Sequence, residues 1–137
     1  MKATDQKVVH PARRISGNVT VPGDKSISHR VAMLSALAAG ESRVKGFLAS
    51  EDCLNTLKAV EALGASIVHD GDTIGIRGTG GAFRAPASVL DMGNSGTGIR
   101  LLTGLLAGHG FKAELTGDAS LRSRPMRRIQ EPLQRMG

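Results

Sequence analysis

Cysteine, aromatic residues and long apolar runs are scarce in this chain of 137 residues, and each scarcity excludes a class of protein. Cys53 is the single cysteine, which excludes a disulfide framework and a cysteine-based zinc site. No stretch approaches the ~18 uninterrupted apolar residues of a membrane-spanning helix. The N-terminus, Met-Lys-Ala-Thr-Asp-Gln-Lys, lacks the apolar core of a secretory signal. These absences predict a cytoplasmic protein without a membrane partner.

The chain is basic, with 18 Lys and Arg against 12 Asp and Glu and a formal net charge of +6. Nucleic acid would suit that charge, but three phenylalanines are the only aromatic residues, so a platform for stacking bases is missing. The charge is also uneven, because five of the cations lie within residues 122–135. We therefore expect no nucleic acid partner and small ligands that carry phosphate or carboxylate groups.

The spacing of apolar residues predicts an α/β (α+β) fold. Strands are expected at residues 18–21, 42–47, 67–68, 73–77, 88–92 and 111–115, and those at 67–68 and 73–77 should form a hairpin across Asp70-Gly71-Asp72. Helices are expected at residues 26–39, 51–63, 99–107 and 125–136. The first helix should bury a stripe of apolar residues: Ile27, Val31, Leu34, Leu37 and Ala38. Ser50 should be the N-cap of the second helix.

The second half of the chain aligns on the first at a shift of 70 to 73 residues, with Arg100 matching Arg30 and Ser123 matching Ser50. We interpret the halves as repeated βαβαββ units, although any two units of this kind would share some of these features. The second unit stops at Gly137, where its next strand should begin. The chain is therefore expected to be the N-terminal part of a longer protein.

Residues 23–30, Gly-Asp-Lys-Ser-Ile-Ser-His-Arg, lie where a turn enters the first helix. The unpaired N–H groups and the dipole of a helix start favour an anion, and Lys25 adds a full positive charge. Arg30 follows Ser26 by four residues, so both side chains lie on one face. These features predict a cradle for phosphate or carboxylate; the alternative is a capped helix with two solvated cations. We expect His29 to be solvated or supporting rather than a general base.

Two further segments favour anions. Residues 93–98, Gly-Asn-Ser-Gly-Thr-Gly, precede a helix, and their glycines allow the backbone to approach a ligand, although a plain glycine-rich turn would look the same. Residues 122–128 contain four arginines, of which Arg122 and Arg124 should reach the ligand-facing end and the others should be solvated. No catalytic triad, carboxylate pair or metal-ligand spacing is visible in the sequence.

Taken together, residues 23–30, 93–97 and 117–126 resemble the first three motifs of the 5-enolpyruvylshikimate-3-phosphate synthase family, in the same order and with fitting spacing. The resemblance implies two domains, each with three βαβαββ units in an inside-out α/β barrel, and substrates in the cleft between them. Residues 1–22 would be a strand segment of the first domain and the crossover. Residues 23–137 would be the first unit and part of the second unit of the other domain, with the remainder of the protein absent.

The resemblance also implies a reaction that uses no metal or organic cofactor. The 5-hydroxyl of shikimate 3-phosphate adds to C2 of phosphoenolpyruvate, and phosphate leaves the tetrahedral intermediate. The product leads to chorismate and the aromatic amino acids. These two small molecules would be the partners, and the full-length protein would be a monomer.

The matching positions imply individual roles. Lys25 would touch both substrates and be the catalytic residue, with Ser26 and Arg30 on shikimate 3-phosphate. The residues on phosphoenolpyruvate would be Lys25, Asn94, Gly96, Thr97 and Arg124. Leu101 stands where well-known members often have proline. Glyphosate competes with phosphoenolpyruvate in this family, and tolerant members commonly have alanine where this chain has Gly96, so a sensitive enzyme is implied.

Two other functions remain open. A sister transferase that acts on UDP-N-acetylglucosamine shares the fold, but its first motif lacks the Lys-Ser-x-Ser-x-Arg arrangement of residues 25–30. A non-enzymatic domain that binds anions or RNA would account for the basic charge alone. The carboxylates that transfer protons in the family would lie after Gly137, so this chain by itself is expected to be inactive.

Overall fold

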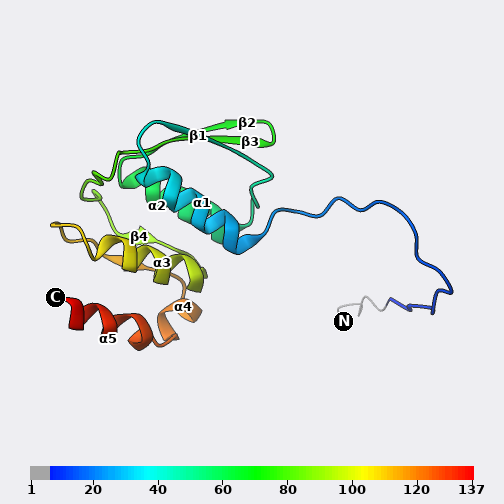
Figure 1. The fold of residues 1–137 in the computed structure, drawn as a ribbon. Helices are drawn as coiled ribbons and strands as arrows, with labels where there is room; N and C mark the ends of the chain where they lie inside the picture. The colour runs from blue at the N-terminus through cyan, green and yellow to red at the C-terminus, as the bar shows by residue number, and fades with distance from the viewer. Residues whose placement is uncertain (1–6) are drawn as a thin grey trace.

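The computed structural model describes residues 7–137 as two stacked groups of elements (Figure 1). The first group contains α1 (Lys25–Leu37), β1 (Glu41–Lys45), α2 (Glu51–Ala62), β2 (Ser66–Asp70) and β3 (Thr73–Arg77). The second contains β4 (Leu90–Asp91), α3 (Gly96–Leu106), β5 (Leu115–Thr116), α4 (Ala119–Ser123) and α5 (Arg127–Met136). The mixture confirms the predicted α/β class. Residues 1–6 of the predicted segment 1–22 lie outside the described residues.

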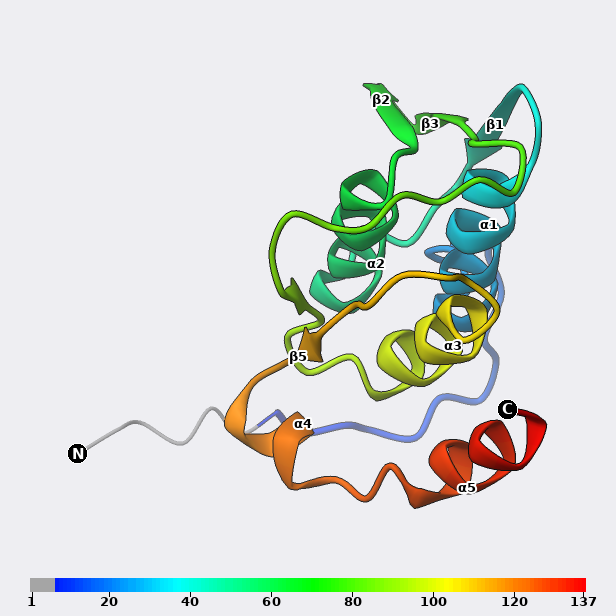
Figure 2. The same cartoon turned by 90° about the vertical axis from the view of Figure 1, so that its left-hand side faces the viewer.

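The first group is a three-stranded antiparallel sheet with α1 and α2 against one face (Figure 2). The strand order is β1-β3-β2, with Glu41 opposite Arg77 across β1 and β3. The central strand buries Ile74 and Ile76. The hairpin predicted around residue 71 is confirmed, because β2 and β3 pair with Asp70 opposite Thr73.

The second group packs α3 against both α1 and α2, while β4 and β5 form a short parallel pair. One hydrophobic core runs through both groups. Its fully buried members include Val60, Leu63, Ile76, Met92, Leu102 and Leu121. This shared core fixes the start of α3 relative to the start of α1.

Helix α1 buries a different face from the predicted one. Ile27 and Leu34 are 66% and 64% exposed. The buried positions are Ser28, His29, Ala32, Met33, Ser35 and Ala36. The small side chains allow neighbouring helices to approach closely, and Ser28 and His29 are satisfied by hydrogen bonds. The predicted stripe is therefore wrong, because α1 has two faces with apolar character and periodicity does not say which one is covered.

Three predicted strands also differ from the structure. Residues 18–21 form no strand, because neither sheet of the described chain provides a neighbour, and Val19 and Val21 are exposed. The strands expected at residues 88–92 and 111–115 shorten to the two-residue β4 and β5, in which only two residue pairs are in register.

The helix predicted at residues 125–136 is confirmed as α5, which begins two residues later, and a short helix that was not predicted, α4, precedes it. Arg124 between them is extended, with φ −78° and ψ 136°. The cause is Pro125, since a residue before proline avoids the helical region. The predicted match of Ser123 with Ser50 is also wrong, because Ser50 precedes α2 whereas Ser123 ends α4.

The first helix of each group makes the same kind of side-chain contact within itself. The Arg30 guanidinium donates to the carbonyl of Ser26 at 3.1 Å, and that of Arg100 donates to the carbonyl of Gly96 at 2.9 Å. Both are contacts to the residue four positions earlier. The predicted match between Arg30 and Arg100 therefore extends to their local geometry.

Each group also contains a close approach between two of its own backbone segments. Gly23 precedes α1 and lies against Gly46, which follows β1; a Cβ on Gly23 would overlap the Gly46 carbonyl oxygen. Gly93 precedes α3 and lies against Gly117, which follows β5; a Cβ on Gly117 would overlap the Gly93 carbonyl oxygen. Glycine is required at these contacts because no side chain fits between the two loops.

Candidate functional site

The first candidate anion-binding turn begins α1. The carboxylate of Asp24 accepts a hydrogen bond of 2.7 Å from the Ile27 amide and caps the helix, so Lys25 and Ser26 occupy its first turn. The Lys25 ammonium donates to the carboxylate of Asp52 in α2 at 2.9 Å. This bond and the charge of Asp52 raise the pKa of Lys25, which keeps the ammonium charged. An ammonium group has three donors, so two are left for a ligand.

The second turn, residues 93–98, leads into α3, which begins three residues before the predicted start at residue 99. The hydroxyl of Ser95 accepts a hydrogen bond of 3.1 Å from the Gly98 amide and caps the helix. Gly96 is buried and Thr97 is exposed in the first turn. The positive end of the helix dipole at this start favours an anion.

Arg124 is held at the second turn by a chain of hydrogen bonds. The Asn94 side-chain amide donates to the carboxylate of Asp118 at 2.7 Å, and its carbonyl oxygen accepts from the Arg124 guanidinium. Only one orientation of the Asn94 amide satisfies both partners. Hydrogen bonds from Asn94 and from the Leu121 amide lower the pKa of Asp118 and keep its carboxylate ionised. The position of Arg124 therefore depends on Asp118 through Asn94.

Gly96 lies between two guanidinium groups. A Cβ built on Gly96 would lie 2.8 Å from Nη1 of Arg124 and 2.9 Å from Nη1 of Arg100. Arg100 also donates to the Pro125 carbonyl at 3.3 Å, which ties α3 to the segment that follows Arg124. The site thus combines two cations with a position that has no side chain, as binding of a small anion requires.

The structure brings three of the predicted site residues together at the start of α3. Lys25 lies at the start of α1, where the charge of Arg124 acts only weakly against the rise in its pKa. Asn94 and Gly96 contact Arg124. Arg30 contacts Ser26 on the exposed side of α1, and Thr97 is exposed on α3.

Sequence analysis did not single out the carboxylates that position these groups. Asp52 holds Lys25 across 27 residues, and Asp118 orients Asn94 across 24 residues. Both lie at helix starts, where an acidic residue is ordinarily explained by capping and by the helix dipole. The capping pattern alone gave no indication of their second partners.

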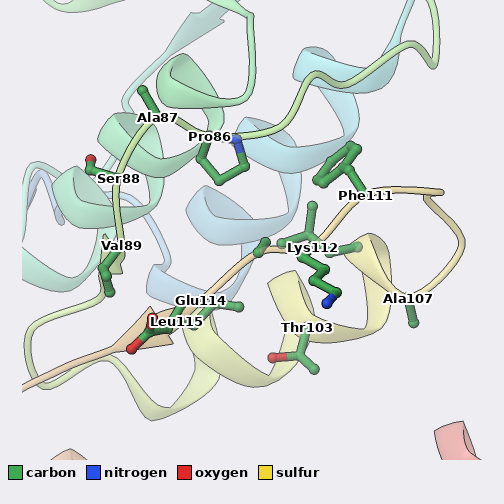
Figure 3. A pocket seen from close by; sticks show the side chains of 12 residues that line it. Pro86, Ala87, Ser88, Val89, Thr103, Ala107, Phe111, Lys112, Glu114 and Leu115 are labelled. Atoms are coloured by element: carbon green, nitrogen blue, oxygen red, sulfur yellow. The ribbon is translucent and has the colours of Figure 1, made fainter.

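A hollow of about 740 Å³ lies away from these turns, between α3 and the segments that lead into β4 and β5 (Figure 3). Its polar lining includes Lys112, Glu114 and Thr103, and none of the predicted site residues borders it. We therefore take the two turns as the candidate site. Within residues 7–137, no three His, Cys, Asp or Glu side chains gather as a metal would require. No helix there has the length and apolar character to cross a bilayer.

Comparison with known proteins identifies the family of the chain. Residues 9–137 match the family described as EPSP synthase (3-phosphoshikimate 1-carboxyvinyltransferase). The chain is 56% identical over 130 residues to the 3-phosphoshikimate 1-carboxyvinyltransferase of Geobacter metallireducens and 53% identical over 131 residues to that of Alkaliphilus metalliredigens. These matches cover 94% and 95% of this chain, but only 30% and 31% of the relatives.

Solved structures give the same result. The EPSP synthase from Acinetobacter baumannii superposes with a TM-score of 0.84 at 51% sequence identity. The superposition covers 88% of this chain and 28% of that protein. The chain therefore spans about 30% of the length of the relatives it matches.

Proposed function

Because the chain belongs to the EPSP synthase family, we propose that it supplies part of the active site of a 3-phosphoshikimate 1-carboxyvinyltransferase. The reaction joins the 5-hydroxyl oxygen of shikimate 3-phosphate to C2 of phosphoenolpyruvate. The hydroxyl loses its proton, C3 gains one, and the C2–O bond to phosphate then breaks, with loss of a proton from C3, to release phosphate. The observation that carries the proposal is the pair of guanidinium groups, those of Arg124 and Arg100, that flank the side-chain-free Gly96 at the start of α3.

We assign each candidate residue by the turn to which it belongs. Lys25 contacts both substrates and stabilises the negative charge that develops between them, with Ser26 and Arg30 on the shikimate 3-phosphate side. The other turn binds phosphoenolpyruvate through Asn94, Gly96, Thr97 and Arg124. Both substrates are anions, so two fixed cations offset their repulsion and favour a common binding place.

We place the reaction in the cytoplasm and in a monomeric protein, as the single cysteine and the family resemblance suggest. In this arrangement residues 1–22 belong to one domain and the crossover, and residues 23–137 to the other. The substrates then bind between the domains, against the starts of α1 and α3.

A hybrid enzyme tests the proposal directly. This chain replaces the matching 30% of the Geobacter metallireducens relative, and phosphate release is measured with shikimate 3-phosphate and phosphoenolpyruvate. We expect turnover that depends on both substrates and on Lys25. UDP-N-acetylglucosamine in place of shikimate 3-phosphate should give none.

The alternative functions predict different results in these measurements. A hybrid that melts cooperatively but releases no phosphate contradicts the proposal, and turnover with UDP-N-acetylglucosamine identifies the sister transferase. Salt-dependent binding of a random oligonucleotide by the chain, without any response to phosphoenolpyruvate, identifies a non-enzymatic domain.

A further inference from the structure

His29 is a completely buried imidazole between the two anion-binding turns. It belongs to α1, four residues after Lys25, and its side chain is 0% exposed. Its Nδ1 lies 2.8 Å from the Thr56 hydroxyl of α2, and its Nε2 lies 3.4 Å from the Ser95 hydroxyl that caps α3. One side chain therefore contacts all three helices of the site.

The Thr56 hydroxyl sets the direction of the hydrogen bonds around His29. When it donates to the Asp52 carbonyl, at 3.3 Å, it accepts from Nδ1–H. Nε2 is then the acceptor, and the Ser95 hydroxyl donates to it. The Ser95 oxygen in turn accepts from the Gly98 amide at 3.1 Å. In this arrangement, which we take for the proposal, the imidazole is neutral and carries its proton on Nδ1.

Protonation of Nε2 would disrupt this chain of bonds. The Ser95 hydroxyl would lose its acceptor, and a positive charge would be buried. Burial lowers the pKa of His29, and Lys25 and Arg30 lower it further, whereas Asp52 raises it. The neutral form is therefore the stable one at neutral pH.

Each end of the chain of bonds reaches a ligand-binding element. At one end it holds the backbone of Asp52, whose carboxylate fixes Lys25. At the other end it holds Ser95, which lies between Asn94 and Gly96. His29 is completely buried and does not face a ligand, so a change at His29 should act on the ligand site through the spacing between the two turns.

We propose that His29 is a positioning residue that sets the Lys25 turn against the Gly96 turn, so that one phosphoenolpyruvate contacts both. The inference rests on the proposed function only for the identity of the ligand. The bridge itself and the coupling between the two turns belong to the chain alone.

The first experiment uses the chain of 137 residues and needs no catalysis. Nitrogen NMR of the His29 ring at pH 7 should show a proton on Nδ1 and none on Nε2. Titration with phosphoenolpyruvate should shift the amide signals of Ser26 and Gly96 with a single Kd. H29L loses both contacts, so the amide signals of Ser26 and Gly96 should then give Kd values that differ by about tenfold or more.

Conservative variants separate positioning from packing. H29N keeps a partner for Thr56, and H29Q keeps one for Ser95, so each should restore part of the coupling. T56V removes the hydroxyl without a change of shape. T103V is the matched control, because Thr103 makes the same contact to the residue four positions earlier, at 2.7 Å to the Ile99 carbonyl.

In the hybrid enzyme, T56V should raise the KM for phosphoenolpyruvate about tenfold with a smaller change in kcat, whereas T103V should change neither. Melting temperatures are measured for both variants. If T56V and T103V lower the melting temperature equally and neither changes the KM, His29 acts in packing alone and the proposal is overturned. A proton on Nε2, or two different Kd values in the unmodified chain, also overturns it. A hybrid without turnover would contradict the proposed function while leaving the NMR results to decide the role of His29.

Discussion

Replacing Gly96 with alanine would place a methyl group between the two guanidinium groups of the site. The new Cβ would lie 2.8 Å from Nη1 of Arg124, whereas a normal contact needs about 3.5 Å. Arg124 must therefore retreat by about 0.7 Å. A charge-assisted hydrogen bond of about 2.8 Å between Arg124 and a ligand would lengthen to about 3.5 Å, the limit for such a bond.

The expected loss follows from that one bond. A hydrogen bond to a charged group contributes about 1.5–3 kcal/mol, so binding through Arg124 should weaken by about 10- to 150-fold if the bond is lost completely. Part of this is recovered where the flexible Arg124 adjusts. Glyphosate is longer than phosphoenolpyruvate and meets the methyl first, so its Ki should rise more than the KM of the substrate.

The assay is inhibition of the hybrid enzyme by glyphosate, measured against phosphoenolpyruvate. The unmodified hybrid should be sensitive, and G96A should raise the ratio of Ki to KM. G104A is the matched control on the same helix, because a Cβ on Gly104 meets nothing within 4 Å. An unchanged ratio in G96A, in a protein that melts normally, would refute the placement of Gly96 beside the ligand.

The isolated chain of 137 residues should release no phosphate from the two substrates, since it spans about 30% of its relatives; turnover in a preparation free of host enzyme would contradict this. In the hybrid, Lys25→Ala should lower kcat/KM by about tenfold or more. Arg128→Ala should lower kcat/KM by less than about threefold, because Arg128 is exposed. Equal losses in the two variants would contradict the placement of Lys25 in the site. Gly23→Ala should lower stability by about 1–3 kcal/mol in thermal unfolding, whereas Gly104→Ala should raise it by up to about 1 kcal/mol, and equal effects would argue against the close backbone approach. Folding lowers the pKa of Asp118, so Asp118→Asn should destabilise the chain at neutral pH. The difference in stability between the variant and the unmodified chain should fade as the pH falls below the ordinary pKa of 3.8. A difference in stability that is independent of pH would show that the charge of Asp118 is not involved.

Local sequence signals located most elements because their causes are local. Asp70-Gly71-Asp72 between apolar pairs predicted the hairpin of β2 and β3, and Ser50 marked the start of α2. The break between α4 and α5 also has a local cause in Pro125, which was assigned to the first turn of the helix predicted at residues 125–136. Proline fits a first turn and also disfavours helix in the residue before it, so its presence alone does not choose between the two.

The burial of His29 could not be read from the sequence, because it depends on partners in two other helices. Thr56 and Ser95 are 27 and 66 residues away. Without them a buried imidazole would be costly, so a solvated histidine was the reasonable expectation. The same holds for Asp52 and Asp118, whose partners are set by tertiary packing.

The paired glycine contacts restrict how the site can move. Gly23 meets Gly46, and Gly93 meets Gly117, through backbone atoms with no side chain between them. Neither ligand-binding turn can shift alone, because the loop behind it would have to shift as well. Since α1, α2 and α3 share one core, both turns are carried on a single rigid body. Any closure around a ligand must therefore be a hinge motion of this whole body rather than the folding over of a flexible loop.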